Sequence, residues 1–203
     1  MATTKAISES PIGVFDSGLG GLTVLKSLKK ILPKESFIYF GDTAHVPYGN
    51  KSTDTVIRYS CSIVDFFIKH KTKAVVIACN TASAVACQKL RKSYNIPLFD
   101  VVEPSVEHAN HISKTREIGV IGTYSTVNSK AYSHSLASLK SDCSVIEIAC
   151  PLFVPLIEEG WSCTHVAKKI ARSYLEAFKD TGIDTLILGC THYPIMVNTI
   201  QEV

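Results

Sequence analysis

Short apolar runs alternate with longer amphipathic segments along the whole chain. Between the runs, apolar residues recur every three or four positions, as they do on one face of a helix. This alternation is typical of β-α units built around a largely parallel sheet and predicts an α/β fold. The runs that we expect to form strands are 12–15, 37–40, 74–78, 97–102, 118–122, 144–149 and 185–189.

Two of the amphipathic segments have clear helical signals. The segment 21–32 has leucines on one face and lysines on the other, and it ends at Pro33, which cannot continue a helix. The segment 52–70 opens with residues that cap helix N-termini, Ser52 among them. The leucines on one face of the first helix are Leu22, Leu25, Leu28 and Leu32. The side chains predicted to be buried in the second helix are Val56, Ile57, Ile63, Val64 and Phe67.

A weak internal repeat divides the chain into two halves. The sequence IGVFDSG at Ile12 is echoed by IGVIGTYS at Ile118, an offset of 118 − 12 = 106 residues. VVIACNTAS is echoed by LILGCTHYP, and the cysteines in these two stretches are 190 − 79 = 111 residues apart. Two similar offsets indicate two related α/β domains. We place them at 1–103 and 104–203, with the boundary in the VVEPS segment.

Composition excludes several classes of protein. Of the 203 residues, 46% are hydrophobic and 19% are charged, as in ordinary globular proteins. The net charge of +3 is too small, and the lysines too scattered, for a nucleic-acid surface. The first ten residues lack the apolar core of a signal peptide, and no apolar run approaches a membrane span. The sequence therefore predicts a cytoplasmic protein without nucleic-acid or membrane partners.

Seven cysteines in a reducing compartment are expected to be thiols. There is no C-x-x-C pair of the kind found in zinc ribbons and thioredoxins. Cys79 and Cys190 each follow a predicted strand, at the carboxyl end where open α/β sheets bind their ligands. The other five are interpreted as small core residues: Cys61, Cys87, Cys143, Cys150 and Cys163.

Two thiols facing each other across a cleft between the domains suit a racemase. One group removes a proton from a carbon, and the other returns a proton to the opposite face. A cysteine with a pKa of about 8.5 is partly ionised near neutrality. Both cysteines precede predicted helix starts, and the positive end of a helix dipole favours the thiolate.

Four sequence blocks resemble those of the glutamate racemases, cofactor-independent enzymes of the aspartate/glutamate racemase superfamily. The blocks are GVFDSGLGGLTVL, YFGDTAHVPYG, ACNTASA and LGCTHYP, and together they span Gly13 to Pro194. The resemblance implies interconversion of L- and D-glutamate, which supplies D-glutamate for bacterial peptidoglycan and hence for the cell wall and cell shape. It also implies a homodimer that needs no cofactor or metal.

The same resemblance implies roles for particular residues. Cys79 is expected to act on D-glutamate with help from Asp16, and Cys190 on L-glutamate with help from His192. All four arginines lie outside the blocks, so the substrate carboxylates are expected to meet hydroxyls and backbone N–H groups instead. The substrate contacts expected are Asp16, Ser17, Tyr48, Gly49, Asn80, Thr81, Thr123, Thr191 and His192.

Several alternatives stay open at this point. Either Glu158 or Glu159 is a candidate to reach the site, and a solvated surface pair is an equal alternative. Asp16 also suits a helix N-cap, and the two cysteines with Asp16 and His192 form a less favoured metal-ligand set. Functional alternatives are an aspartate racemase, another amino-acid racemase of the same superfamily, or a non-catalytic binding relative.

The end of the chain raises one further expectation. In the first half a strand follows the helix after Cys79, whereas no such strand follows Cys190 before Val203. The racemases that the chain resembles continue beyond this point and return to the first domain. We therefore expect a truncated form of a longer enzyme.

Overall fold

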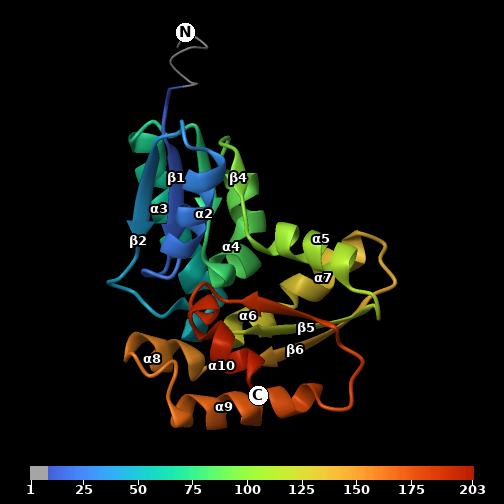
Figure 1. Cartoon of the computed structure of the whole chain (residues 1–203). Coiled ribbons are helices and arrows are strands. Elements are labelled where there is room, and N and C mark those ends of the chain that lie inside the picture. The colour runs from blue at the N-terminus through green and yellow to red at the C-terminus, as the bar shows by residue number, and fades with distance from the viewer. Residues whose placement is uncertain (1–8) are drawn as a thin grey trace. The chain divides into compact units, whose positions relative to one another are not determined.

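The computed structural model describes residues 9–203, so most of the segment considered for a signal peptide lies outside the described residues. The chain divides into two compact units, the first ending at Val101 and the second running from Val102 to Val203. Each unit has its own parallel sheet with flanking helices (Figure 1). The predicted α/β class and the two-domain repeat are confirmed.

The first unit has a four-stranded sheet of order β2-β1-β3-β4. Its strands are β1 (Ile12–Asp16), β2 (Phe37–Gly41), β3 (Ala74–Ile77) and β4 (Leu98–Phe99). All three pairings are parallel. Parallel strands place their carboxyl ends at one edge, so the residues after β1, β2 and β3 meet there.

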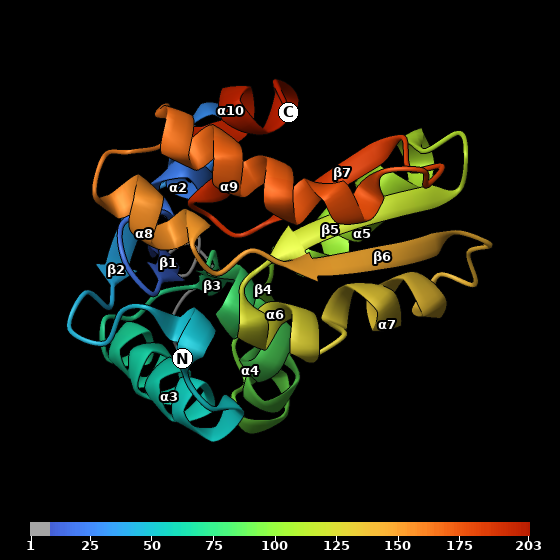
Figure 2. The same cartoon turned by 90° about the horizontal axis from the view of Figure 1, so that it is seen from below.

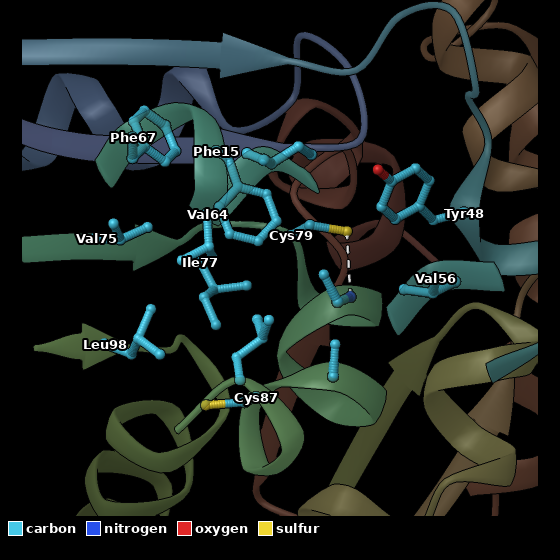
Figure 3. Packing of buried hydrophobic residues seen from close by; sticks show 14 residues of the cluster. Phe15, Tyr48, Val56, Val64, Phe67, Val75, Ile77, Cys79, Cys87 and Leu98 are labelled. Atoms are coloured by element: carbon cyan, nitrogen blue, oxygen red, sulfur yellow. Dashed lines mark hydrogen bonds between the residues drawn. The ribbon is translucent and has the colours of Figure 1, made fainter. Parts of the chain in front are cut away.

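Two helices cover one face of this sheet, and a third lies on the other face (Figure 2). On the first face are α3 (Thr53–Lys69), which Ser52 caps as predicted, and α4 (Asn80–Ser93). Their apolar side chains pack with those of β1 and β3 into one core (Figure 3). On the other face is α2 (Leu22–Ile31), and the short 3-10 helix η1 (Tyr48–Asn50) follows β2.

The leucine face predicted for α2 is not fully buried. No side chain of α2 is buried, and Leu22 is 44% exposed. Helical periodicity identified the helix correctly, but periodicity does not reveal whether a partner covers the apolar face. In α3, four of the five expected core residues are buried, and Ile57 is half-buried.

The strand expected over 97–102 is limited to Leu98 and Phe99. The chain then turns, because the Asp100 carboxylate pairs with Arg91 at 2.9 Å and the Val101 N–H donates to the Ser83 hydroxyl. Helix α5 starts at Val102, so the division between the units falls two residues before the boundary expected at 103/104.

The second unit repeats the topology of the first. Its sheet has the order β6-β5-β7, with all pairs parallel. The strands are β5 (Glu117–Gly122), β6 (Ser144–Ala149) and β7 (Thr185–Gly189). Just as β1 lies between β2 and β3, β5 lies between β6 and β7, and the echoed sequences occupy equivalent strands.

Helices cover both faces of the second sheet (Figure 1). One core lies under α5 and α7 and a second under α8, α9 and α10. Within residues 9–203, no helix is both long and apolar enough to cross a membrane. The helices are α5 (Val102–Ile112), α6 (Tyr124–Asn128), α7 (Ala131–Ser138), α8 (Phe153–Glu158), α9 (His165–Leu175), η2 (Glu176–Phe178), η3 (Tyr193–Met196) and α10 (Val197–Gln201).

We predict that Gly13→Ala destabilises the first unit. A Cβ at this position would lie 2.7 Å from the Phe67 ring, which is fully buried in the core. Overpacking of this kind costs about 1–3 kcal/mol of unfolding free energy, which urea denaturation measures. Phe67→Leu makes room for the methyl group, so the double variant should lose less than the sum of the two single losses. Strict additivity would contradict this account of the close packing.

Candidate active site

One group of the predicted site residues, here called the first half-site, lies at the carboxyl edge of the first sheet. Asp16 ends β1, and Cys79 follows β3, whose extension is tied to β1 by the Ala78 N–H donating to the Phe15 carbonyl at 2.8 Å. The structure thus brings Asp16 and Cys79 to neighbouring strand ends. The other predicted members near this edge are Ser17, Tyr48, Gly49, Asn80 and Thr81, all of them buried.

Cys79 caps the N-terminus of α4. Its sulfur accepts a hydrogen bond from the Ala82 N–H at 3.4 Å, and its thiol donates to the Ser17 hydroxyl oxygen at 3.7 Å. Figure 3 shows the sulfur pointing toward the Tyr48 ring, with the bond from α4 dashed. The helix start that the sequence predicted is therefore present.

The expected preference for the thiolate is wrong for Cys79. Burial and the negative charge of Asp16 raise the pKa of the thiol to about 11, although the hydrogen bonds from Ala82 and with Ser17 lower it. The sequence argument considered only the helix terminus, which is the weaker influence here. Cys79 therefore holds its proton near neutral pH until something removes it.

Asp16 lies in a tightly packed loop. Its Oδ2 accepts the Gly18 N–H at 3.0 Å, and a Cβ on Gly21 would come within 2.5 Å of the Asp16 Cβ. The helix N-cap role that the sequence allowed for Asp16 is wrong, because the N-cap of α2 is Gly21 and no side chain caps that helix. The carboxylate instead binds the turn that follows β1, and it lies close enough to raise the pKa of Cys79.

Tyr48 is held by an aspartate that the sequence analysis missed. Its hydroxyl donates to Asp42 Oδ2 at 2.6 Å, and His45 Nδ1 lies 2.8 Å from Asp42 Oδ1. Burial and the hydrogen bond to Asp42 raise the pKa of Tyr48, so the phenol stays protonated. Asp42 follows β2 directly and lies in the YFGDTAH block, so the argument that found Asp16 would have found it too.

The second half-site lies at the carboxyl edge of the second sheet. Gly122 of β5 pairs with Gly189 of β7, so Thr123 and Cys190 follow adjacent strand ends. Thr123 caps α6, where its hydroxyl lies 3.0 Å from that of Thr126. Cys190 and the next two residues, Thr191 and His192, are all buried.

His192 links Cys190 to a carboxylate. His192 Nδ1 lies 3.8 Å from the Cys190 sulfur, and His192 Nε2 lies 3.3 Å from Glu158 Oε1. The choice left open between two glutamates is thus decided in favour of Glu158, at the end of α8. The helix expected after Cys190 begins later, as the 3-10 turn η3 at Tyr193.

The remaining cysteines are free thiols, as expected. Cys87 and Cys150 are buried and Cys61 and Cys143 are half-buried, but Cys163 is exposed, contrary to its interpretation as a core residue. It lies in the loop before α9 rather than on an inward helix face. Within residues 9–203, no group of three or more His, Cys, Asp or Glu side chains is arranged to hold a metal ion.

The fold and the two thiol sites define a class: a repeated α/β protein with a buried cysteine at the carboxyl edge of each sheet. The sequence profile of the Asp/Glu/Hydantoin racemase family matches residues 12–203. A glutamate racemase of Geobacter metallireducens is 50% identical over 191 residues, which cover 94% of this chain and 71% of the relative. One from a Sulfurihydrogenibium species is 52% identical over 192 residues, covering 94% and 74%.

A solved structure agrees with these relatives. The glutamate racemase of Francisella tularensis, determined in complex with D-glutamate, is 42% identical and superposes with a TM-score of 0.91 over 96% of this chain and 73% of that one. The chain therefore belongs to the Asp/Glu/Hydantoin racemase family and, within it, to the glutamate racemases.

We predict that Cys79 reacts as a high-pKa thiol. Because only the thiolate is alkylated, peptide-resolved labelling with iodoacetamide should still be accelerating at pH 10, whereas N-acetylcysteine levels off earlier. Asp16→Asn removes one cause of the raised pKa, so labelling near pH 8 should become faster, by about tenfold for each unit that the pKa falls. The exposed Asp54→Asn is the control. A plateau below pH 9 in the unmodified protein would contradict the prediction.

Proposed function

We propose that this protein interconverts L- and D-glutamate by transferring protons at the α-carbon between two cysteines. The observation that carries the proposal is the pair of thiols, Cys79 and Cys190, each following an equivalent strand and each beside its own acid-base partner. The names of the relatives and the match to the family profile support the substrate assignment.

The reaction needs one base and one acid on opposite faces of the α-carbon. From D-glutamate, the Cys79 thiolate takes the α-proton, and the electron pair passes into the α-carboxylate as an enediolate. The Cys190 thiol then donates its proton to the opposite face, which gives L-glutamate and leaves Cys79 as thiol and Cys190 as thiolate. The reverse reaction starts from that protonation state, so protons balance in both directions. The facing arrangement of the two half-sites is part of this proposal.

The partners make each thiol available as a base. Cys79 holds its proton at neutral pH, so it must be deprotonated when the substrate binds. Asp16 is the carboxylate whose charge acts on this thiol, and its proposed role is to assist that deprotonation. On the other side, His192 accepts the Cys190 proton while Glu158 stabilises the positive ring that results. The two half-reactions thus use different partners.

Buried hydroxyl, amide and backbone groups at the two edges suit an amino acid with two carboxylates. Asn80 and Thr81 occupy the first turn of α4, where backbone N–H groups point out of the helix. Such groups, together with hydroxyls, bind carboxylates without an arginine. The proposed substrate contacts are those expected from the sequence: Asp16, Ser17, Tyr48, Gly49, Asn80, Thr81, Thr123, Thr191 and His192.

The wider setting belongs to the same proposal. A glutamate racemase would supply D-glutamate to peptidoglycan synthesis in the cytoplasm, and the homodimer expected from the resemblance remains a prediction. Operation without a cofactor also remains a prediction. Glutamate is preferred to aspartate as substrate because the relatives near 50% identity carry the name glutamate racemase.

The direct test is circular dichroism of L-glutamate incubated with the protein and no added cofactor. We expect the signal to decay to zero, and aspartate to react far more slowly. Cys79→Ser and Cys190→Ser should each lower turnover by at least about 100-fold, because a hydroxyl is a much weaker acid-base group. Cys163→Ser is the control, since this cysteine is exposed in a loop. No decay, or near-normal turnover of either variant, would contradict the proposal.

Isotope effects test the assignment of partners. Enantiomers have equal free energies, so kcat/KM is equal in both directions for every variant, and kcat/KM alone does not separate the half-reactions. We expect Asp16→Asn to slow proton removal by Cys79, which should raise the isotope effect with D-[2-²H]glutamate and lower it with the L isomer. His192→Asn should do the opposite. Identical changes in the two variants would indicate a general structural role.

A further inference from the structure

Tyr39 occupies the middle of β2, directly opposite Val14 of β1. The sequence alone suggests no role for Tyr39, because tyrosine is a common residue in β-strands. Its hydroxyl, however, donates a hydrogen bond of 2.8 Å to the carbonyl of Gly18, which lies 21 residues earlier in the chain. The bond therefore ties β2 to the loop that follows β1.

The end of β1 and the start of that loop carry two of the groups that influence Cys79, Asp16 and Ser17. The Gly18 N–H donates to Asp16 Oδ2 at 3.0 Å, so the same residue is bound on its carbonyl side by Tyr39 and on its amide side by Asp16. Ser17 lies between these anchors, and its hydroxyl accepts from the Cys79 thiol. A shift of the Gly18 peptide would move both Asp16 and Ser17.

The packing around this bond leaves no spare room. A Cβ on Gly21 would lie 2.9 Å from the Tyr39 hydroxyl oxygen, and one on Gly41 would lie 2.5 Å from the Gly18 carbonyl oxygen. Both distances are shorter than real Cβ contacts, so these glycines allow the hydroxyl, the carbonyl and the Asp16 side chain to meet. The contact is thus built into the local structure from three chain segments.

We propose that Tyr39 is a positioning residue of the first half-site, whose hydroxyl fixes the Gly18 carbonyl and thereby holds Asp16 and Ser17 at Cys79. The inference rests on the proposed function. Burial, together with the charges of Asp16 and Cys79, raises the pKa of Tyr39, so the hydroxyl remains a donor throughout turnover. The hydroxyl proton of Tyr39 is donated to the Gly18 carbonyl, so the proposed role is not direct proton transfer to the substrate.

Tyr39→Phe removes the hydrogen bond and keeps the ring. Tyr94→Phe is a matched control, because the Tyr94 hydroxyl also donates to a backbone carbonyl of the same unit, that of Cys61 at 3.1 Å. The main readout is the pH profile of Cys79 labelling by iodoacetamide, which needs no catalytic activity. Release of the loop lets Asp16 withdraw and water approach, so labelling near pH 8 should become up to about tenfold faster.

Three further results are expected if Tyr39 acts through Asp16. Tyr39→Phe should raise the isotope effect with D-[2-²H]glutamate, as Asp16→Asn does. The acceleration of labelling in the double variant should be smaller than the product of the two single accelerations, because both changes act in part through the Asp16 carboxylate. Gly21→Ala, whose methyl group would intrude between Tyr39 and Asp16, should shift the labelling profile in the same direction.

The proposal is overturned if Tyr39→Phe and Tyr94→Phe lose similar thermal stability while the Cys79 profile stays unchanged in both. It is also overturned if the labelling rates of Tyr39→Phe and Asp16→Asn multiply in the double variant. Failure of the unmodified protein to racemise glutamate would contradict the proposed function instead, and the labelling experiment would still decide the role of Tyr39.

Discussion

The Cys79 thiol lies buried beside the carboxylate of Asp16, and both circumstances oppose its ionisation. The group that acts as a base in the proposed mechanism is therefore kept protonated in the site, and its thiolate is a strong base once it forms. The rest of the first half-site can be understood from this opposition between the raised pKa of the thiol and its proposed role as a base. Ala82 and Ser17 offer partial compensation through hydrogen bonds, and the loop around Gly18 fixes how close the carboxylate comes.

The second half-site has the same strand topology as the first, but different side chains lie beside its thiol. Cys190 follows β7 as Cys79 follows β3, but its partner is a histidine two residues later, connected to Glu158. The negative charge of Asp16 opposes ionisation of Cys79, whereas the side chain beside Cys190 is an imidazole and not a carboxylate. The two units therefore place their cysteines after equivalent strands, but they differ in the side chain that lies beside each thiol.

Sequence pattern was sufficient for six of the seven strands and for the positions of both cysteines at strand ends, because apolar runs and strand ends are local features. It was insufficient where the outcome depends on contacts from distant segments. The pKa of Cys79 depends on burial and on Asp16, which lies more than sixty positions earlier. The incomplete burial of α2 and the contact of Glu158, rather than Glu159, with His192 also depend on which segments pack nearby. Hydrophobic periodicity predicts neither of them.

Equal free energies of the two enantiomers set a limit on how such a site can be tuned. Any variant changes kcat/KM by the same factor in both directions, so the difference between a carboxylate partner and a histidine partner appears in the isotope effect of each direction, or in kcat and KM separately. A carboxylate that raises the pKa of Cys79 favours the form with the proton on that thiol, which is the form ready to protonate the intermediate toward D-glutamate. In the proposed mechanism this form, with Cys190 as the thiolate, is the one that binds L-glutamate productively, and the proposed role of Tyr39 is to fix how closely Asp16 is held to the thiol.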